Sequence, residues 1–178
     1  VRQLGANGIE VAARRRPVPH PQALTIVDAS GERTIMVTGG RLSPTLDDGL
    51  AWDELADFDG VYFIGDDPRT LVAARKARHL VVTARRLQTL INSGVTADVL
   101  VASAHDKDEV VDLASLPVAP RALVLTEGAK GGRIIVDGHE RRYSAVSPPP
   151  PVVDAYGAGD CFAGALTVRP YQALPPIQ

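Results

Sequence analysis

The most telling part of this sequence is Asp154-Ala155-Tyr156-Gly157-Ala158-Gly159-Asp160, followed by Cys161-Phe162-Ala163-Gly164-Ala165-Leu166. Glycines on both sides of Ala158 leave the backbone bare, and the small and apolar residues after Asp160 predict a buried helix. The first N–H groups of a helix lack partners within it and lie at the positive end of the helix dipole, so a turn of this kind binds anionic oxygen. Asp160 repels such an anion. We therefore expect its carboxylate to take a proton from a hydroxyl group that attacks a phosphate.

The string DAYGAGDCFAGAL resembles the signature of the ribokinase-like (PfkB-type) carbohydrate kinases, Asp-Thr-x-Gly-Ala-Gly-Asp followed by a small and apolar helix. Ala155 stands where the signature has threonine. Members of this family transfer the γ-phosphate of ATP to a hydroxyl of a sugar, a nucleoside or a related small molecule. The resemblance implies that Asp160 is the catalytic base and that the amides of Gly157, Ala158 and Gly159 form an anion hole. The alternative is a glycine-rich turn in which Asp160 only caps the helix.

A second glycine-rich segment, 126–132, follows a predicted strand and reads TEGAKGG. It is similar to the family's Thr-x-Gly-x-x-Gly segment, which lines the nucleotide phosphates. The resemblance implies ATP contacts from Thr126, Gly128 and Gly131, and from Lys130, whose ammonium could equally point to water. The segment is neither a Walker A loop nor a dinucleotide fingerprint.

The family also carries an Asn-x-x-Glu motif that organises water around Mg²⁺. Counting from Asp98 places Ser103 and Asp106 at its two ends, so both residues depart from the pattern. The resemblance implies that Ser103 lies near ATP and that Asp106 holds Mg²⁺ through water. Asp106 is equally suited to cap a following helix. Asp154 matches a position at which many relatives bind a monovalent cation, which implies a K⁺ site.

Composition restricts the class of protein. The chain has 178 residues, 45% of them hydrophobic, and a net charge of −2, which predicts one globular domain. No basic face or membrane-length apolar run is present, so we expect neither nucleic acid nor a membrane as partner. The single cysteine, Cys161, excludes an internal disulfide, and no signal-peptide pattern opens the chain. These features predict a cytoplasmic protein, with Cys161 buried at the start of its helix.

The middle of the chain alternates short apolar strands with helices. Strands are expected at 61–64, 79–83, 98–102 and 122–126, and helices at 69–78, 87–91 and 106–116. This pattern predicts an α/β fold, a ribokinase-like three-layer sandwich with a mostly parallel central sheet. A hairpin is expected at 133–143, and the prolines at 148–151 predict an extended connector. Ligands of such sheets bind beyond the carboxyl ends of the strands.

The segment 24–38 reads as another hairpin, with Gly31-Glu32-Arg33-Thr34 at its turn. A comparable strand-turn-strand forms the β-lid over the sugar in ribokinase-like proteins, and an ordinary hairpin is the alternative. We expect residues 1–178 to be a single, partial kinase domain that lacks N- and C-terminal parts, with 24–38 as part of a β-lid through which a homodimer forms.

Together these features predict an ATP-dependent phosphotransferase that uses Mg²⁺, with a sugar or nucleoside-like small molecule as acceptor. The alternative is a ribokinase-like protein that binds a ligand or has a regulatory role without catalysis. Ser103, Asp106 and Ala155 favour that alternative, because each departs from the family's pattern. A Rossmann-type oxidoreductase is disfavoured because no Gly-x-Gly-x-x-Gly follows an early strand.

Overall fold

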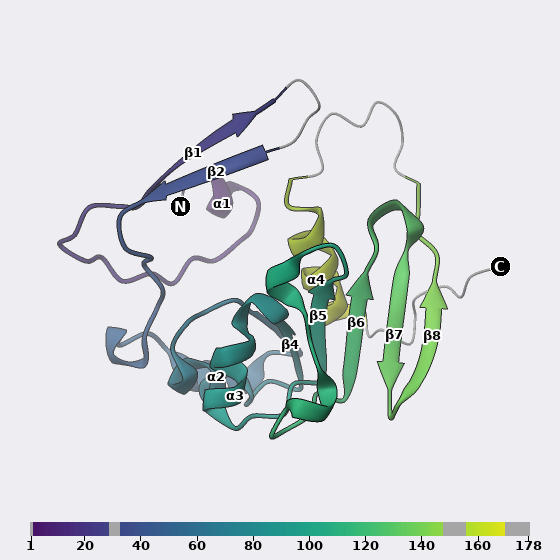
Figure 1. The fold of residues 1–178 in the computed structure, drawn as a ribbon. Coiled ribbons are helices and arrows are strands. Elements are labelled where there is room, and N and C mark those ends of the chain that lie inside the picture. The colour runs from purple at the N-terminus through teal and green to yellow at the C-terminus, as the bar shows by residue number, and fades with distance from the viewer. Residues whose placement is uncertain (1, 29–32, 148–155, 170–178) are drawn as a thin grey trace. The chain divides into compact units, whose positions relative to one another are not determined.

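The computed structural model describes residues 2–28, 33–147 and 156–169, and it divides into two compact units, Val1–Leu50 and Ala51–Gln178 (Figure 1). Each unit is described by itself. The proline connector predicted at 148–151 lies outside the described residues, as do Gly31 and Glu32 of the turn at 31–34. That the two units form one kinase domain stays a prediction. None of the helices in the described ranges is long and apolar enough to cross a bilayer.

The first unit contains a short helix α1 (Arg2–Ala6) and an antiparallel hairpin of β1 (Gln22–Val27) and β2 (Arg33–Thr38), which confirms the hairpin expected at 24–38. β-Branched side chains on both strands favour this pairing. A 3₁₀ turn, η1 (Leu46–Asp48), follows.

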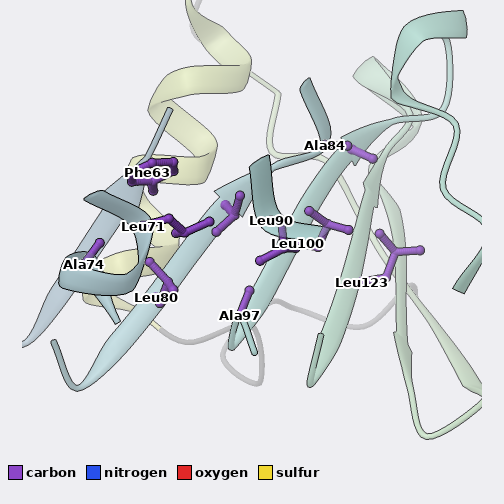
Figure 2. Close-up of a cluster of buried hydrophobic side chains, with 11 residues drawn as sticks. Phe63, Leu71, Ala74, Leu80, Ala84, Leu90, Ala97, Leu100 and Leu123 are labelled. Carbon is purple, nitrogen blue, oxygen red and sulfur yellow. The ribbon is translucent and has the colours of Figure 1, made fainter. Parts of the chain in front are cut away.

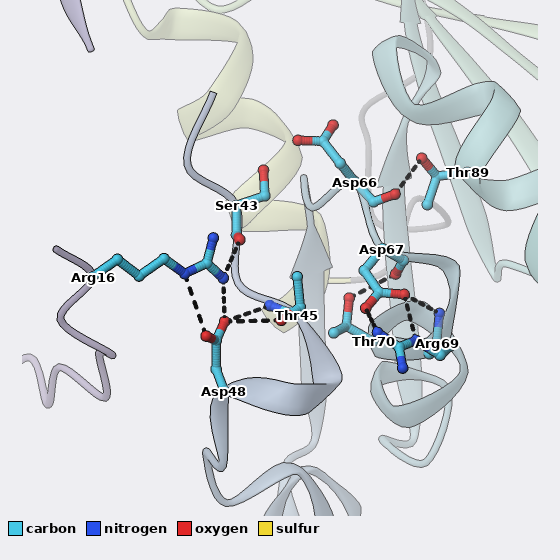
Figure 3. A network of polar contacts seen from close by, with 9 residues as sticks. All are labelled: Arg16, Ser43, Thr45, Asp48, Asp66, Asp67, Arg69, Thr70 and Thr89. Atoms are coloured by element: carbon cyan, nitrogen blue, oxygen red, sulfur yellow. Dashed lines mark hydrogen bonds and ion pairs between the residues drawn. The ribbon is translucent and has the colours of Figure 1, made fainter. Parts of the chain in front are cut away.

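Asp48 connects two segments of this unit. Its carboxylate accepts hydrogen bonds from Arg16 at 2.5 Å and from the Thr45 N–H at 2.7 Å (Figure 3). These two donors hold the pKa of Asp48 below its usual range. Arg16 is therefore part of a half-buried ion pair.

A six-stranded sheet forms the centre of the second unit, in the order β3-β4-β5-β6-β7-β8. Its strands are β3 (Gly60–Phe63), β4 (His79–Thr83), β5 (Val99–Ser103), β6 (Ala122–Thr126), β7 (Gly132–Val136) and β8 (His139–Tyr143). The first four are parallel, while β7 is antiparallel to both of its neighbours. The turn between β7 and β8 has positive φ at Asp137 and Gly138, as a two-residue hairpin requires. The mostly parallel sheet of the predicted α/β fold is confirmed.

Helices cover both faces of this sheet, because successive side chains of a strand point to opposite faces. Leu80 and Val82 of β4 pack with Leu71 of α2 (Pro68–Ala74) and Leu90 of α3 (Leu87–Ser93), as Figure 2 shows for this cluster. Val81 packs instead with side chains of α4 (Ala158–Val168) on the other face. The layers are therefore helix, sheet and helix. Gly94 ends α3 in the left-handed conformation that glycine adopts most readily.

One predicted helix is shorter than expected, and the prediction of another is wrong. The helix expected at 69–78 ends at Ala74, where the guanidinium of Arg75 donates to three backbone carbonyls beyond it. The helix expected at 106–116 is replaced by two 3₁₀ turns, η4 (Lys107–Glu109) and η5 (Leu113–Ser115). Asp106 and Asp112 each accept from a backbone N–H two residues on, and this local bond competes with helix formation.

A buried carboxylate holds the amino edge of the sheet together. Asp98 accepts from Arg75 at 2.6 Å and from the Leu80 N–H at 2.7 Å, and it pairs with Arg121 at 3.2 Å. Burial alone would raise the pKa of Asp98, but the Leu80 N–H and the Arg75 guanidinium outweigh it and hold that pKa below its usual range. Asp98 thus joins β4, β5 and the end of α2.

We expect Asp98→Asn to lower the free energy of unfolding by about 2–4 kcal/mol at pH 7, because the buried Leu80 N–H and the partly buried Arg75 guanidinium lose their charged acceptor. A carboxyl group whose pKa is lowered by folding stabilises the folded chain, and this contribution is complete at pH values above the unfolded pKa of about 3.9. The contribution is lost as the pH falls through the folded pKa. Urea unfolding at pH 7 and at pH 3 should therefore show a large difference that shrinks in acid. The matched control is Asp59→Asn, whose partner Arg78 is also exposed; an equal loss in both variants would contradict this role.

Candidate active site

The parallel strands β3 to β6 bring their carboxyl ends to one edge of the sheet, which is where ligands of such folds bind. Thr83, Ser103 and Thr126 are the last residues of β4, β5 and β6, and Ser103 lies opposite Thr126 in the register. Polar residues from separate parts of the sequence, such as Thr83 and Thr126, are therefore gathered at this edge.

Asp160 lies exposed in the first turn of α4. Gly157 precedes the helix with φ 79°, a left-handed conformation that other residues adopt only with strain, and its carbonyl accepts from the Cys161 N–H at 2.9 Å. The N–H groups of Ala158, Gly159 and Asp160 belong to the first turn, whose donors have no carbonyl partner within the helix. The predicted anion hole and the predicted base are thus at the same helix end.

Close packing fixes where α4 begins. A Cβ at Gly60, the first residue of β3, would lie 2.4 Å from the carbonyl oxygen of Thr167, so only glycine lets the far end of α4 approach the start of this strand. At the other end, the Tyr62 hydroxyl donates to Asp160 Oδ1 at 2.9 Å. The helix therefore runs antiparallel to β3, and its N-terminus lies at the carboxyl edge.

Cys161 is exposed, so the prediction that it is buried is wrong. The inward side of α4 is formed by Phe162, Ala163 and Leu166, and Phe162 stacks on Tyr143 with ring centroids 5.8 Å apart. Cys161 lies outside this apolar stripe. Because the neighbouring residues are small and apolar, the sequence did not indicate which side of the helix faces inward.

Ser103 and Asp106 lie together in a network of charges. The Asp106 carboxylate accepts from the Asp108 N–H at 2.9 Å, so it caps η4, and it also pairs with Arg85. Arg85 reaches Glu109 Oε1 at 2.7 Å, and Glu109 Oε2 accepts from the Ser103 N–H at 2.7 Å. Glu109 is buried and was not singled out in the sequence, although it lies three residues after Asp106.

The donor set at Ser103 and Asp106 suits a magnesium ion that keeps its own water. A carboxylate has several lone-pair positions, so Asp106 can accept from a water molecule while it pairs with Arg85. Mg²⁺ prefers oxygen ligands and usually retains several waters. Within the described ranges, no group of three His, Cys, Asp or Glu side chains that could hold a metal ion directly is present.

The glycine-rich segment is a closed loop that contains η6 (Gly128–Lys130). The Glu127 N–H donates to the Gly131 carbonyl at 2.8 Å, and a Cβ at Gly131 would lie 2.0 Å from the Tyr143 carbonyl oxygen. The Glu127 carboxylate accepts from Arg133 at 2.7 Å and from Arg142 at 2.6 Å, another arrangement that was not foreseen. Thr126 is half-buried and Lys130 is exposed. Gly131 therefore has a packing role in addition to any contact with phosphate.

The acidic pair after β3 has structural roles. Asp67 caps α2 by accepting from the Arg69 N–H at 2.9 Å, and the Asp66 carbonyl accepts from Thr89 (Figure 3). The Asp66 carboxylate pairs with Arg86 at 3.1 Å. Asp154, expected at a K⁺ site, lies outside the described residues.

Comparisons with known proteins agree on one family. A family model described as "pfkB family carbohydrate kinase" matches residues 2–172. Among curated proteins, the chain is similar to an acarbose 7(IV)-phosphotransferase from an Actinoplanes species, with 54% identity over 48 residues, 26% of this chain and 16% of that protein.

Solved structures share the fold. A ribokinase from Giardia lamblia has a TM-score of 0.69 at 19% identity, over 94% of this chain and 60% of that one. A nucleoside kinase from Methanocaldococcus jannaschii gives 0.62 at 16%, with the same coverages. A sugar kinase from Pyrococcus horikoshii, solved with ATP, gives 0.65 at 17%, over 94% and 63%. The chain thus spans about three fifths of the length of these structures.

We expect Arg85→Ala to lower the free energy of unfolding by about 1–3 kcal/mol, because the buried Glu109 loses its cation. Arg78→Ala is the control, since both members of its pair with Asp59 are exposed and such pairs contribute about 0–1 kcal/mol. Glu109→Gln in the Arg85→Ala background should recover part of the loss. Equal unfolding midpoints in urea for the two arginine variants would count against a buried network here.

Proposed function

Because the chain belongs to the pfkB family of carbohydrate kinases, we propose that it carries the phosphoryl-transfer site of an ATP-dependent kinase that acts on a hydroxyl of a sugar or a related small molecule. The observation that carries this proposal is the position of Asp160, exposed in the first turn of α4 at the carboxyl edge of the sheet. A base and a set of free backbone donors are then within one helical turn of each other.

In this proposal, Asp160 accepts the proton of the acceptor hydroxyl as its oxygen attacks the γ-phosphorus in line, and ADP leaves. A positioned base of this kind contributes about 10²–10⁴-fold. Negative charge in the transition state lies on the equatorial oxygens of the phosphoryl group. The N–H groups of Gly157, Ala158 and Gly159 meet that charge without having to reorganise.

The remaining edge residues bind the nucleotide and its ions. Thr126, Gly128, Lys130, Gly131 and Ser103 would line the phosphates of ATP. Mg²⁺ would neutralise charge on those phosphates, with Asp106 holding its water shell, and Asp154 would contribute to a K⁺ site. Support comes from the closed glycine loop at the end of β6 and from the carboxylate and serine at the end of β5.

The acceptor is proposed as a class only. One similar protein is named for acarbose, and others are named as a ribokinase and nucleoside kinases. What these names share is a small molecule with several hydroxyl groups. A cytoplasmic location, with no nucleic acid or membrane as partner, belongs to the same proposal.

The hairpin of β1 and β2 is proposed as a β-lid and as the contact of a homodimer. Its apolar side chains support this role, because Ile26, Ile35 and Val37 are each about half exposed or more, at 50%, 48% and 64%. An exposed apolar ribbon of this kind gains stability when a ligand or a second chain covers it.

A ligand-binding protein without catalysis is the second candidate. One observation favours it: Arg85 already pairs with Asp106 and Glu109, so the carboxylates near the implied magnesium site are partly neutralised by the chain itself. Ala155, which stands where the family signature has threonine, also favours a protein without catalysis.

We expect Asp160→Asn to lose at least a hundredfold in turnover while ATP binds within about twofold of the wild type, because the amide cannot accept the proton. The measurement is ADP release from Mg·ATP with a panel of sugars and nucleosides, beside calorimetric titration of ATP. Asp137→Asn is the matched control, since Asp137 lies in the β7–β8 turn at the opposite edge of the sheet.

The outcomes separate the two candidates. Turnover in Asp160→Asn close to that of the wild type would refute Asp160 as the base. ATP binding by the wild type with no ADP release on any acceptor would favour the protein without catalysis.

A further inference from the structure

The Tyr62 side chain makes a contact that the proposed reaction does not yet explain. Its hydroxyl donates to Asp160 Oδ1 at 2.9 Å, across 98 residues of sequence. Tyr62 is the third residue of β3, and its half-buried ring packs against the apolar cluster that contains Val81 of β4 and Ala163 and Leu166 of α4. A strand of the sheet therefore holds the donor, while Asp160 itself is exposed.

The phenol stays a donor over the working range of pH. Three effects raise the pKa of Tyr62 far above its ordinary value of about 10: burial, the hydrogen bond that Tyr62 donates to Asp160, and the negative charge of Asp160. The charge of Glu109 makes a smaller contribution in the same direction. Thr83, at the end of β4, acts in the opposite direction and does not reverse the effect. Tyr62 thus offers Asp160 a proton in a hydrogen bond without giving it up.

An exposed aspartate side chain has free rotation in water, and only some of its rotamers aim an oxygen at a substrate. A hydrogen bond to one oxygen restricts that rotation and leaves Oδ2 and the remaining lone pairs for another donor. Catalytic groups that are held by a supporting contact reach the productive geometry more often, and small misplacements are costly in rate.

We propose that Tyr62 is a positioning residue: its hydroxyl holds Oδ1 of Asp160 so that Oδ2 faces the acceptor hydroxyl. This inference rests on the proposed function. Tyr62 does not take part in bond making: the proton of the acceptor goes to Asp160, and the phenol keeps its own. The same contact fixes the first turn of α4, and with it the amides of the anion hole, relative to β3.

The kinetic test compares Tyr62→Phe with Tyr143→Phe. Each variant loses one phenolic oxygen from a ring that is at least half-buried, but the Tyr143 hydroxyl donates to the Leu125 carbonyl at 3.3 Å and not to Asp160. We expect Tyr62→Phe to lower kcat about tenfold with the KM for ATP unchanged, and Tyr143→Phe to keep kcat within twofold. Wild-type kcat in Tyr62→Phe, or an equal fall in both variants, would overturn the proposal.

A second measurement does not need activity. A double-mutant cycle of Tyr62→Phe and Asp160→Ala is followed by urea unfolding of the 178-residue chain. If the two side chains interact, the shift in midpoint caused by Tyr62→Phe is smaller in the Asp160→Ala background than in the wild type. Equal shifts in both backgrounds would overturn the contact on which the inference rests.

The two tests keep this inference apart from the proposed function. Non-additive unfolding with wild-type turnover in Asp160→Asn would refute the base while the contact stands. Loss of turnover in Asp160→Asn with additive unfolding and normal kcat in Tyr62→Phe would support the base and refute the positioning role.

Discussion

The geometry of the candidate site depends on how closely α4 packs against the sheet. Glycine at position 60 lets the Thr167 carbonyl approach the start of β3, and the apolar stripe of Phe162, Ala163 and Leu166 lies against the face that Val81 also lines. With that end of the helix fixed, its N-terminus lies at the carboxyl edge of the parallel strands. Asp160 and the free amides of the first turn take their positions from this packing, because they belong to the same helix.

Charged residues at the two edges of the sheet have different roles. At the amino edge, Asp98 is enclosed by arginines and by a backbone N–H, an arrangement that stabilises the fold. At the carboxyl edge, Arg85 joins Asp106 to the buried Glu109, and Glu109 in turn holds the backbone at Ser103. Ser103 and Asp106, the two residues that depart from the family's motif, therefore belong to an ordered network of ion pairs and hydrogen bonds.

The sequence predicted the features that local patterns encode. Short apolar runs between turn residues identified β3 to β6, and two adjacent residues that tolerate positive φ, Asp137 and Gly138, identified the β7–β8 hairpin. The prediction of a helix at 106–116 was wrong because the Asp106 and Asp112 carboxylates accept hydrogen bonds from backbone N–H groups two residues on. The Tyr62–Asp160 contact, the burial of Glu109 and the exposure of Cys161 depend on packing between distant segments, which periodicity does not report.

In the proposed reaction, the first turn of α4 binds the phosphoryl group in transfer. Amide chemical shifts in ¹⁵N-labelled chain test this binding as Mg·ADP and aluminium fluoride, an analogue of the phosphoryl transition state, are added. We expect large downfield shifts at Gly157, Ala158 and Gly159 that need the fluoride as well as ADP, and little change at Asp137 and Gly138 on the opposite edge. If the chain binds the complex but the amides at 157–159 do not shift, the phosphoryl group is not bound at this turn.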